Sequence, residues 1–160
     1  MIDRPALLAR LDAVADRLRA LAERDREGLT APDTDTGERW EAAQVWGHLA
    51  EFPEYWLPQV RGVIDARSEE PVPFGRTKRD PERAARIEAR RALRPAEAMA
   101  AVEASLAGWR ELVDSLGPDD LARRGLHPTI GEMTVPAMLE RFLLNHLEEH
   151  AEQLESLPPA

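Results

Sequence analysis

Residues 134–150 read TVPAMLERFLLNHLEEH, and their spacing predicts a long helix with one buried face. Side chains three or four positions apart project from the same side of an α-helix. A polar ring on a face that packs into a core is costly unless another group bonds to it. The face begins with apolar residues and ends with two imidazoles, in the order Val135, Leu139, Phe142, His146 and His150.

A second histidine motif lies upstream, in the sequence WEAAQVWGH at residues 40–48. On a helix, His48 lies at the edge of the apolar face, so its ring can point into the same core. Three imidazoles from two helices can bind one zinc ion and leave a position for water, as in catalytic sites. Nickel, copper and iron also accept imidazole, and the sequence does not select among them.

Each histidine also has a simpler interpretation. A single histidine on an apolar face is more often a core residue bonded to a neighbour than a ligand, although the three together favour a metal. His127 precedes a proline in a predicted loop, so we expect it to be exposed; over the bundle end it would act as a proton shuttle or a substrate contact. Glu51 and Glu149 are interpreted as surface groups or as carboxylates that orient a ring, rather than as a fourth ligand.

Four amphipathic segments predict an all-α four-helix bundle, and residues 1–160 are interpreted as one domain. Pro53 and Pro58 fall inside the second segment, which we expect to be one bent helix. No strand pattern is long enough to predict a sheet. The expected helices are residues 4–26, about 38 to the loop at 68–80, 95–116 and 134–156, with a short extra helix near 81–93 in the long connection between the second and third helices.

The composition narrows the functional classes. Of the 160 residues, 43% are hydrophobic and 32% are charged, and the net charge is −9. Nucleic acid is not an expected partner of so acidic a chain. The absence of cysteine excludes disulfides, thiolate metal sites and a cysteine nucleophile. Because we find no signal peptide and no apolar run long enough for a bilayer, we expect a cytoplasmic protein without a membrane partner.

Two charged segments are interpreted as solvated surface. The acidic cluster in the first loop lacks the glycine and the closing glutamate of an EF-hand. The basic run from Arg76 to Arg94 is expected to be a solvated face, with a patch for an anion or a partner as the alternative. The acidic cluster consists of Asp33, Asp35 and Glu38.

The two histidine motifs resemble the DinB-like superfamily of metal-binding four-helix bundles. The matching pieces are residues 40–56, centred on WGHLA, and residues 133–154, which contain HLEEHAEQL. The resemblance implies a divalent metal, often zinc or nickel, bound by His48, His146 and His150. Relatives include transferases and isomerases that use mycothiol or bacillithiol, and some are dimers. The resemblance therefore implies a low-molecular-weight thiol as a possible cofactor and a small-molecule substrate or thiol as the partner. It also implies that a homodimer is a possible assembly.

Three functions remain open from the sequence. The first is a metal-dependent enzyme of the thiol-dependent transferase type, with a metal-dependent hydrolase as the alternative chemistry of the same site. The second is a non-catalytic metal-binding protein, and the third is a structural or dimeric helical bundle. If the protein is an enzyme, we expect its substrate to enter at one end of the bundle, with walls from Trp46, Phe52 and the loop of His127.

Overall fold

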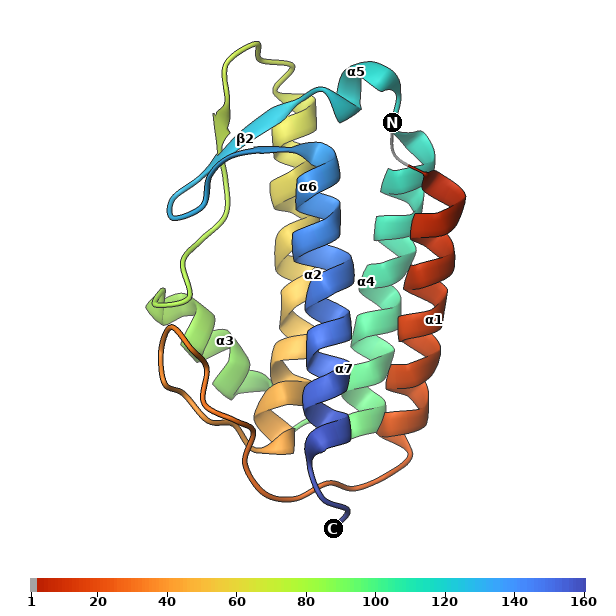
Figure 1. Cartoon of the computed structure of the whole chain (residues 1–160), viewed down its shortest axis with the longest axis vertical. Helices are drawn as coiled ribbons and strands as arrows, with labels where there is room; N and C mark the ends of the chain where they lie inside the picture. The colour runs from red at the N-terminus through yellow and green to blue at the C-terminus, as the bar shows by residue number, and fades with distance from the viewer. Residues whose placement is uncertain (1–2) are drawn as a thin grey trace.

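Four long helices lie side by side in the computed structural model, which describes residues 3–160 (Figure 1). Two of them lead from the top of the view to the bottom, and the other two lead upward. The all-α bundle that the periodicity predicts is confirmed. The four are α1 (Arg4–Ala22), α2 (Ala42–Asp65), α4 (Pro95–Ser115) and the continuous run of α6 (Val135–Leu139), the π-helical segment η1 (Glu140–Asn145) and α7 (His146–Ser156).

Local chemistry sets several helix boundaries. Asp3 caps α1 by accepting a hydrogen bond from the Ala6 N–H, and Thr134 caps α6 through the Ala137 N–H. The first helix ends earlier than residue 26, because residues 25–27 pair with the C-terminal residues 158–160. The second helix starts later than residue 38, because Trp40 is bonded to Thr30 through backbone and side-chain hydrogen bonds.

The second helix is one element, as expected, although Pro53 and Pro58 lie inside it. The chain then returns along the bundle through the long connection that leads to α4 (Figure 1). That connection contains the short helix α3 (Pro81–Arg90), close to the residues 81–93 expected. Because the connection carries the chain back to the bottom, α2 and α4 run in the same direction.

A small sheet at the top of the bundle is the main departure from the expected fold. Its strands are β1 (Val72–Pro73), β2 (Arg124–His127) and β3 (Gly131–Thr134), and the short helix α5 (Pro118–Leu121) precedes β2. β1 pairs parallel to β2, and β2 pairs antiparallel to β3. Strands of two to four residues are too short for an alternating pattern to be recognised in the sequence.

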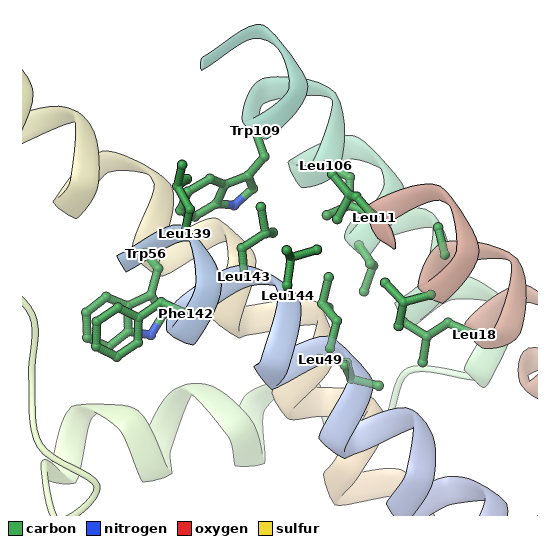
Figure 2. Packing of buried hydrophobic residues seen from close by; sticks show 14 of the residues in the cluster. Leu11, Leu18, Leu49, Trp56, Leu106, Trp109, Leu139, Phe142, Leu143 and Leu144 are labelled. Atoms are coloured by element: carbon green, nitrogen blue, oxygen red, sulfur yellow. The ribbon is translucent and has the colours of Figure 1, made fainter. Parts of the chain in front are cut away.

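The core lies where the helices face one another, and leucines from all four fill it (Figure 2). Trp109 of α4 is fully buried, and its Nε1 donates a hydrogen bond to the Pro53 carbonyl at 3.0 Å. Within residues 3–160, no helix has both the length and the apolarity needed to cross a bilayer. The fully buried side chains include Leu11, Leu18, Leu49, Leu106, Leu139, Leu143 and Leu144.

Candidate metal centre

The structure brings His48, His146 and His150 together. His48 lies in the first half of α2 and the other two lie on α7, and these two helices are side by side (Figure 1). One nitrogen of each ring lies within 4.8 Å of one nitrogen of each of the others. The three residues are 2%, 9% and 8% exposed, so they form a buried cluster of three histidines.

Among these three rings, only His150 makes a side-chain hydrogen bond within residues 3–160, so all three have a nitrogen free for a ligand. Nδ1 of His150 lies 2.6 Å from the Gln153 Oε1 and donates to it, which leaves Nε2 as the unprotonated atom. Nε2 of His146 is buried and has no hydrogen-bond partner in the described part of the chain. Buried polar atoms without partners are rare and call for an explanation. A divalent ion held by three imidazoles fits this donor set.

The protonation states also fit a metal. Burial lowers the pKa of His48 and His146 well below the usual value, and it lowers the pKa of His150 to about 4. The rings are therefore neutral at pH 7, so each has a nitrogen lone pair. Metal ligation requires neutral imidazole, and the folded chain supplies it without any cost of deprotonation near neutral pH.

Glu51 is a buried carboxylate beside His48. Its Oε2 lies 3.6 Å from the His48 Nδ1, and its Oε1 accepts a hydrogen bond from Arg76. Burial raises the pKa of Glu51, while the Arg76 bond opposes that change. Glu51 is not among the converging ligand atoms, and at 3.6 Å its Oε2 makes no hydrogen bond to the His48 Nδ1, so the carboxylate lies beside the ring without a bond that fixes it. Glu149 is exposed and is also outside the cluster.

Arg76 contradicts the interpretation of the whole basic run as a solvated face. Its residue exposure is only 7%, and its guanidinium lies 3.8 Å from the centroid of the Tyr55 ring while it pairs with Glu51. The charge pattern of the sequence did not reveal that Arg76 is buried, because its partner Glu51 lies 25 residues upstream on α2. The later members of the run do form exposed ion pairs, as Arg90 does with Glu54.

His127 is buried, not exposed as predicted. Its Nδ1 accepts hydrogen bonds from the backbone N–H groups of Thr129 and Ile130, so the ring proton is on Nε2, which donates to the Arg76 carbonyl at 3.0 Å. Nδ1 therefore stabilises the turn after β2, and Nε2 attaches β2 to the long connection. That arrangement does not support a proton shuttle. The ring is instead part of an aromatic wall, stacked with Trp56 and Phe142.

A cavity of about 680 Å³ opens onto the three histidines. Its lining residues come from the middle of α2, from η1 and α7, and from the α1–α2 loop, the long connection and the β2–β3 turn, so it lies along the side of α2 and α7 rather than at the bundle end. Phe52 lines it as expected, but Trp46 is packed in the core and does not. Trp40 is a further residue of the cavity wall that was not predicted, and its ring lies 6.1 Å from the His150 ring in a stacked arrangement. Its position in the WEAAQVWGH motif was the available signal.

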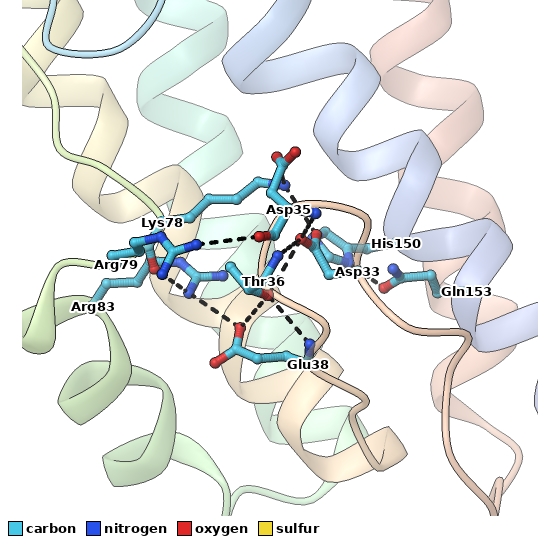
Figure 3. Close-up of polar contacts among 9 residues, drawn as sticks. All are labelled: Asp33, Asp35, Thr36, Glu38, Lys78, Arg79, Arg83, His150 and Gln153. Carbon is cyan, nitrogen blue, oxygen red and sulfur yellow. Dashed lines mark hydrogen bonds and ion pairs between the residues drawn. The ribbon is translucent and has the colours of Figure 1, made fainter.

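Charged side chains join the α1–α2 loop and the long connection at this cavity (Figure 3). Lys78 donates to Asp33 at 2.9 Å and to Asp35 at 2.8 Å. Burial alone would raise the pKa of Asp33. The hydrogen bonds that its carboxylate accepts from Lys78 and from two backbone N–H groups outweigh burial and lower the pKa to about 2. Glu38 lies 3.9 Å from Arg83. The acidic cluster therefore lines the cavity and contacts the basic connection; it is more than the solvated surface that its composition predicted.

Solved structures with the same fold support the description of the bundle. YfiT from Bacillus subtilis, described as a probable metal-dependent hydrolase with an unusual four-helix bundle topology, superposes with a TM-score of 0.75 at 17% identity, over 97% of this chain and 86% of that chain. The mycothiol-dependent maleylpyruvate isomerase superposes with a TM-score of 0.71 at 13% identity, over 98% of this chain. The present chain spans 65% of the isomerase. At these identities the likeness concerns the fold.

The sequence itself carries the assignment. No curated protein matches it. The profile of the DinB superfamily, however, matches residues 9–154, which include all three histidines and most of the four long helices. Because this match covers most of the chain, the protein belongs to the DinB superfamily.

Proposed function

We propose that this protein is a divalent-metal-dependent enzyme whose ion is bound by His48, His146 and His150. One observation carries the proposal: three neutral imidazoles converge on the wall of a cavity of about 680 Å³. A structural zinc site is closed by four protein ligands, whereas a catalytic site has three and an accessible position. A bound ion would lower the pKa of water or of a thiol and so supply a nucleophile at neutral pH.

The residues around the three histidines have separate roles in this proposal. Gln153 fixes the orientation of the His150 ring through Nδ1, and the buried Glu51 places a carboxylate oxygen 3.6 Å from the His48 Nδ1. Trp40 and Phe52 lie against the rings and exclude water from them. Low polarity around the site strengthens the electrostatic effect of a bound ion.

A thiol-dependent transferase is the reaction type that we favour. The chain has no cysteine, so a thiol nucleophile would come from a separate small molecule. The cavity extends from Trp40 beyond the histidines to His127, and its volume lies well within the range of pockets that hold whole ligands. That volume accommodates a thiol together with a substrate. The shared fold with the mycothiol-dependent isomerase supports this choice.

A metal-dependent hydrolase is the second candidate. The fold shared with YfiT, described as a probable metal-dependent hydrolase, favours it, since that likeness covers most of both chains. A hydrolase would use a water, rather than a thiol, at the accessible position. The same three histidines would bind the metal in both reactions, so the experiment has to distinguish a thiol nucleophile from a water nucleophile.

Metal content and thiol binding test the proposal together. The protein is purified without chelator or a nickel column, analysed for metals, loaded with zinc or nickel, and screened with low-molecular-weight thiols by thermal unfolding. A ligand at about 100 times its Kd stabilises by about 2.7 kcal/mol, which raises the Tm of a chain of this size by roughly 5–10 °C. We expect such a shift in the wild type and in Glu149→Gln, but not in His146→Ala.

The outcomes separate the candidates. Metal binding with no thiol shift, accompanied by turnover of an ester or amide, would favour the hydrolase. A protein that binds neither zinc nor nickel, or binds them as tightly in His146→Ala as in the wild type, would contradict the metal site. The Glu149→Gln control matters because its side chain lines the same cavity yet lies outside the histidine cluster.

A further inference from the structure

Arg83 is a largely buried cation without a close anionic partner. It projects from α3 into the wall of the histidine cavity, and its side chain is only 12% exposed. The nearest carboxylate oxygen, Oε2 of Glu38, is 3.9 Å away, which is too far for a hydrogen bond. Its Nη1 donates to the Lys78 carbonyl at 2.9 Å. Across residues 3–160, no acceptor bonds to its Nε or Nη2.

The other cations in the cavity wall are better compensated or better hydrated. Lys78 bonds to two carboxylates, and Arg76 pairs through Nη2 with the buried Glu51, although its Nη1 has no partner within residues 3–160. Arg79 is exposed and donates to the Asp35 carbonyl. Arg141 has no partner in the described part of the chain, but it is exposed, so water solvates its charge. A charge removed from water is costly unless it is paired and hydrogen-bonded. Burial accordingly lowers the pKa of Arg83, although Glu38 opposes the change.

The position of Arg83 connects this charge to the candidate metal centre. Its Cζ lies 5.3 Å from the centroid of the Trp40 ring, and that ring contacts both His48 and His150. The Arg83 charge is close enough to lower the pKa of all three histidines. A group bound by the free Nε–Nη2 edge would therefore lie beside the histidine cluster.

We propose that Arg83 binds a carboxylate of the substrate through its Nε–Nη2 edge and so positions the substrate beside the histidines. This inference rests on the proposed enzymatic function and adds a substrate class to it. Two parallel N–H groups match the two oxygens of a carboxylate, and hydrogen bonds between charged groups are about twice as strong as neutral ones. The bound carboxylate would also supply the negative counter-charge that the Arg83 guanidinium lacks in the folded protein.

The surroundings favour a carboxylate with a single charge over a phosphate. Asp33, Asp35 and Glu38 line the same part of the cavity, beside the cations Lys78, Arg79 and Arg83. A dianion on Arg83 would be repelled by these carboxylates more strongly than a monoanion. The matching ligand is therefore a small carboxylic acid whose reactive end points toward the histidines.

The test compares a carboxylate with an uncharged analogue of the same size. The full chain, with and without zinc, is titrated with butyrate and with butyramide, and the Trp40 indole N–H is followed by NMR after assignment with Trp40→Phe. We expect butyrate to bind about 10-fold to 100-fold more tightly than butyramide. In Arg83→Gln the ratio should fall to about one, whereas Arg83→Lys should retain part of it, since it keeps the charge but not the paired N–H groups.

Arg86→Gln is the matched control, because Arg86 lies one turn further along α3 and pairs with Glu82 at the surface. It should keep the wild-type ratio. Equal binding of butyrate and butyramide by the wild type, or an unchanged ratio in a folded Arg83→Gln protein, would overturn the proposal. Tighter binding of inorganic phosphate than of butyrate would overturn the carboxylate assignment. Since the titration of metal-free protein needs neither metal nor thiol, its failure is distinguishable from failure of the proposed function.

Discussion

His150 makes the stability of the metal-free protein depend on pH. The residue is 8% exposed, and burial lowers its pKa from 6.5 to about 4. The unfolded chain therefore binds a proton at this residue between those two values, while the folded chain does not. Because the unfolded state binds more protons in that window, the free energy of unfolding falls as the pH falls.

The magnitude follows from the difference between the two pKa values. One pKa unit corresponds to about 1.4 kcal/mol, so the fall from 6.5 to about 4 makes His150 responsible for about 3 kcal/mol. This stabilisation is fully present above pH 6.5 and is lost progressively down to about pH 4. Burial lowers the pKa of His48 and His146 in the same direction, so their contributions add to the loss.

The assay compares the wild type with His150→Gln by urea unfolding of chelator-treated protein at several pH values. Glutamine keeps a polar side chain but cannot take up the proton. In the window below pH 6.5 the wild type should lose about 1.4 kcal/mol more per pH unit than the variant, which corresponds to one proton. Carboxylates such as Glu51 titrate in both proteins, so their effect cancels in the difference. Parallel stability curves for the two proteins would refute the reasoning.

Three further substitutions test the packing around the site. Gly47→Ala should destabilise the protein by about 1–3 kcal/mol, because a Cβ there would lie 2.9 Å from the backbone oxygen of Ile87 and force α2 and α3 apart. Gly62→Ala, on the same helix with no atom within 4 Å of its Cβ position, should instead stabilise it by about 0.5–1 kcal/mol. Trp109→Phe should cost about 1–3 kcal/mol, since it removes the hydrogen bond to the Pro53 carbonyl and leaves a small void. Urea unfolding measures all three; a neutral Gly47→Ala variant would contradict the close approach of the helices.

The helices could be predicted because their signals are local. Thr134 caps the last long helix, and the apolar spacing after it leads directly to His146 and His150 on one face. The side on which His48 projects was predicted in the same way from its own helix. A π-helical segment immediately before His146 was not predicted, since six residues of altered hydrogen bonding leave no distinct pattern in the sequence.

The remaining parts of the site could not be read from local patterns, because they depend on contacts between distant segments. Arg76, in the long connection, is buried because Glu51 of α2 lies behind it, and His127 is buried because its ring bonds to the Arg76 carbonyl 51 residues away. Neither residue has neighbours in sequence that indicate burial. The acidic cluster likewise appeared to be surface until Asp33 and Asp35 were found beside Lys78.

The sequence by itself determined four amphipathic helices and a buried face carrying histidines, since periodicity and capping act over a few residues and need no knowledge of the fold. Only the tertiary structure decided that the three rings converge, that a cavity opens beside them, and that Arg83 faces that cavity with a free edge. The cavity and the position of Arg83 depend on the path of the long connection after α2. The connection folds back along the bundle and places charged side chains beside the histidines. No local spacing in the sequence relates those charged residues to the histidines.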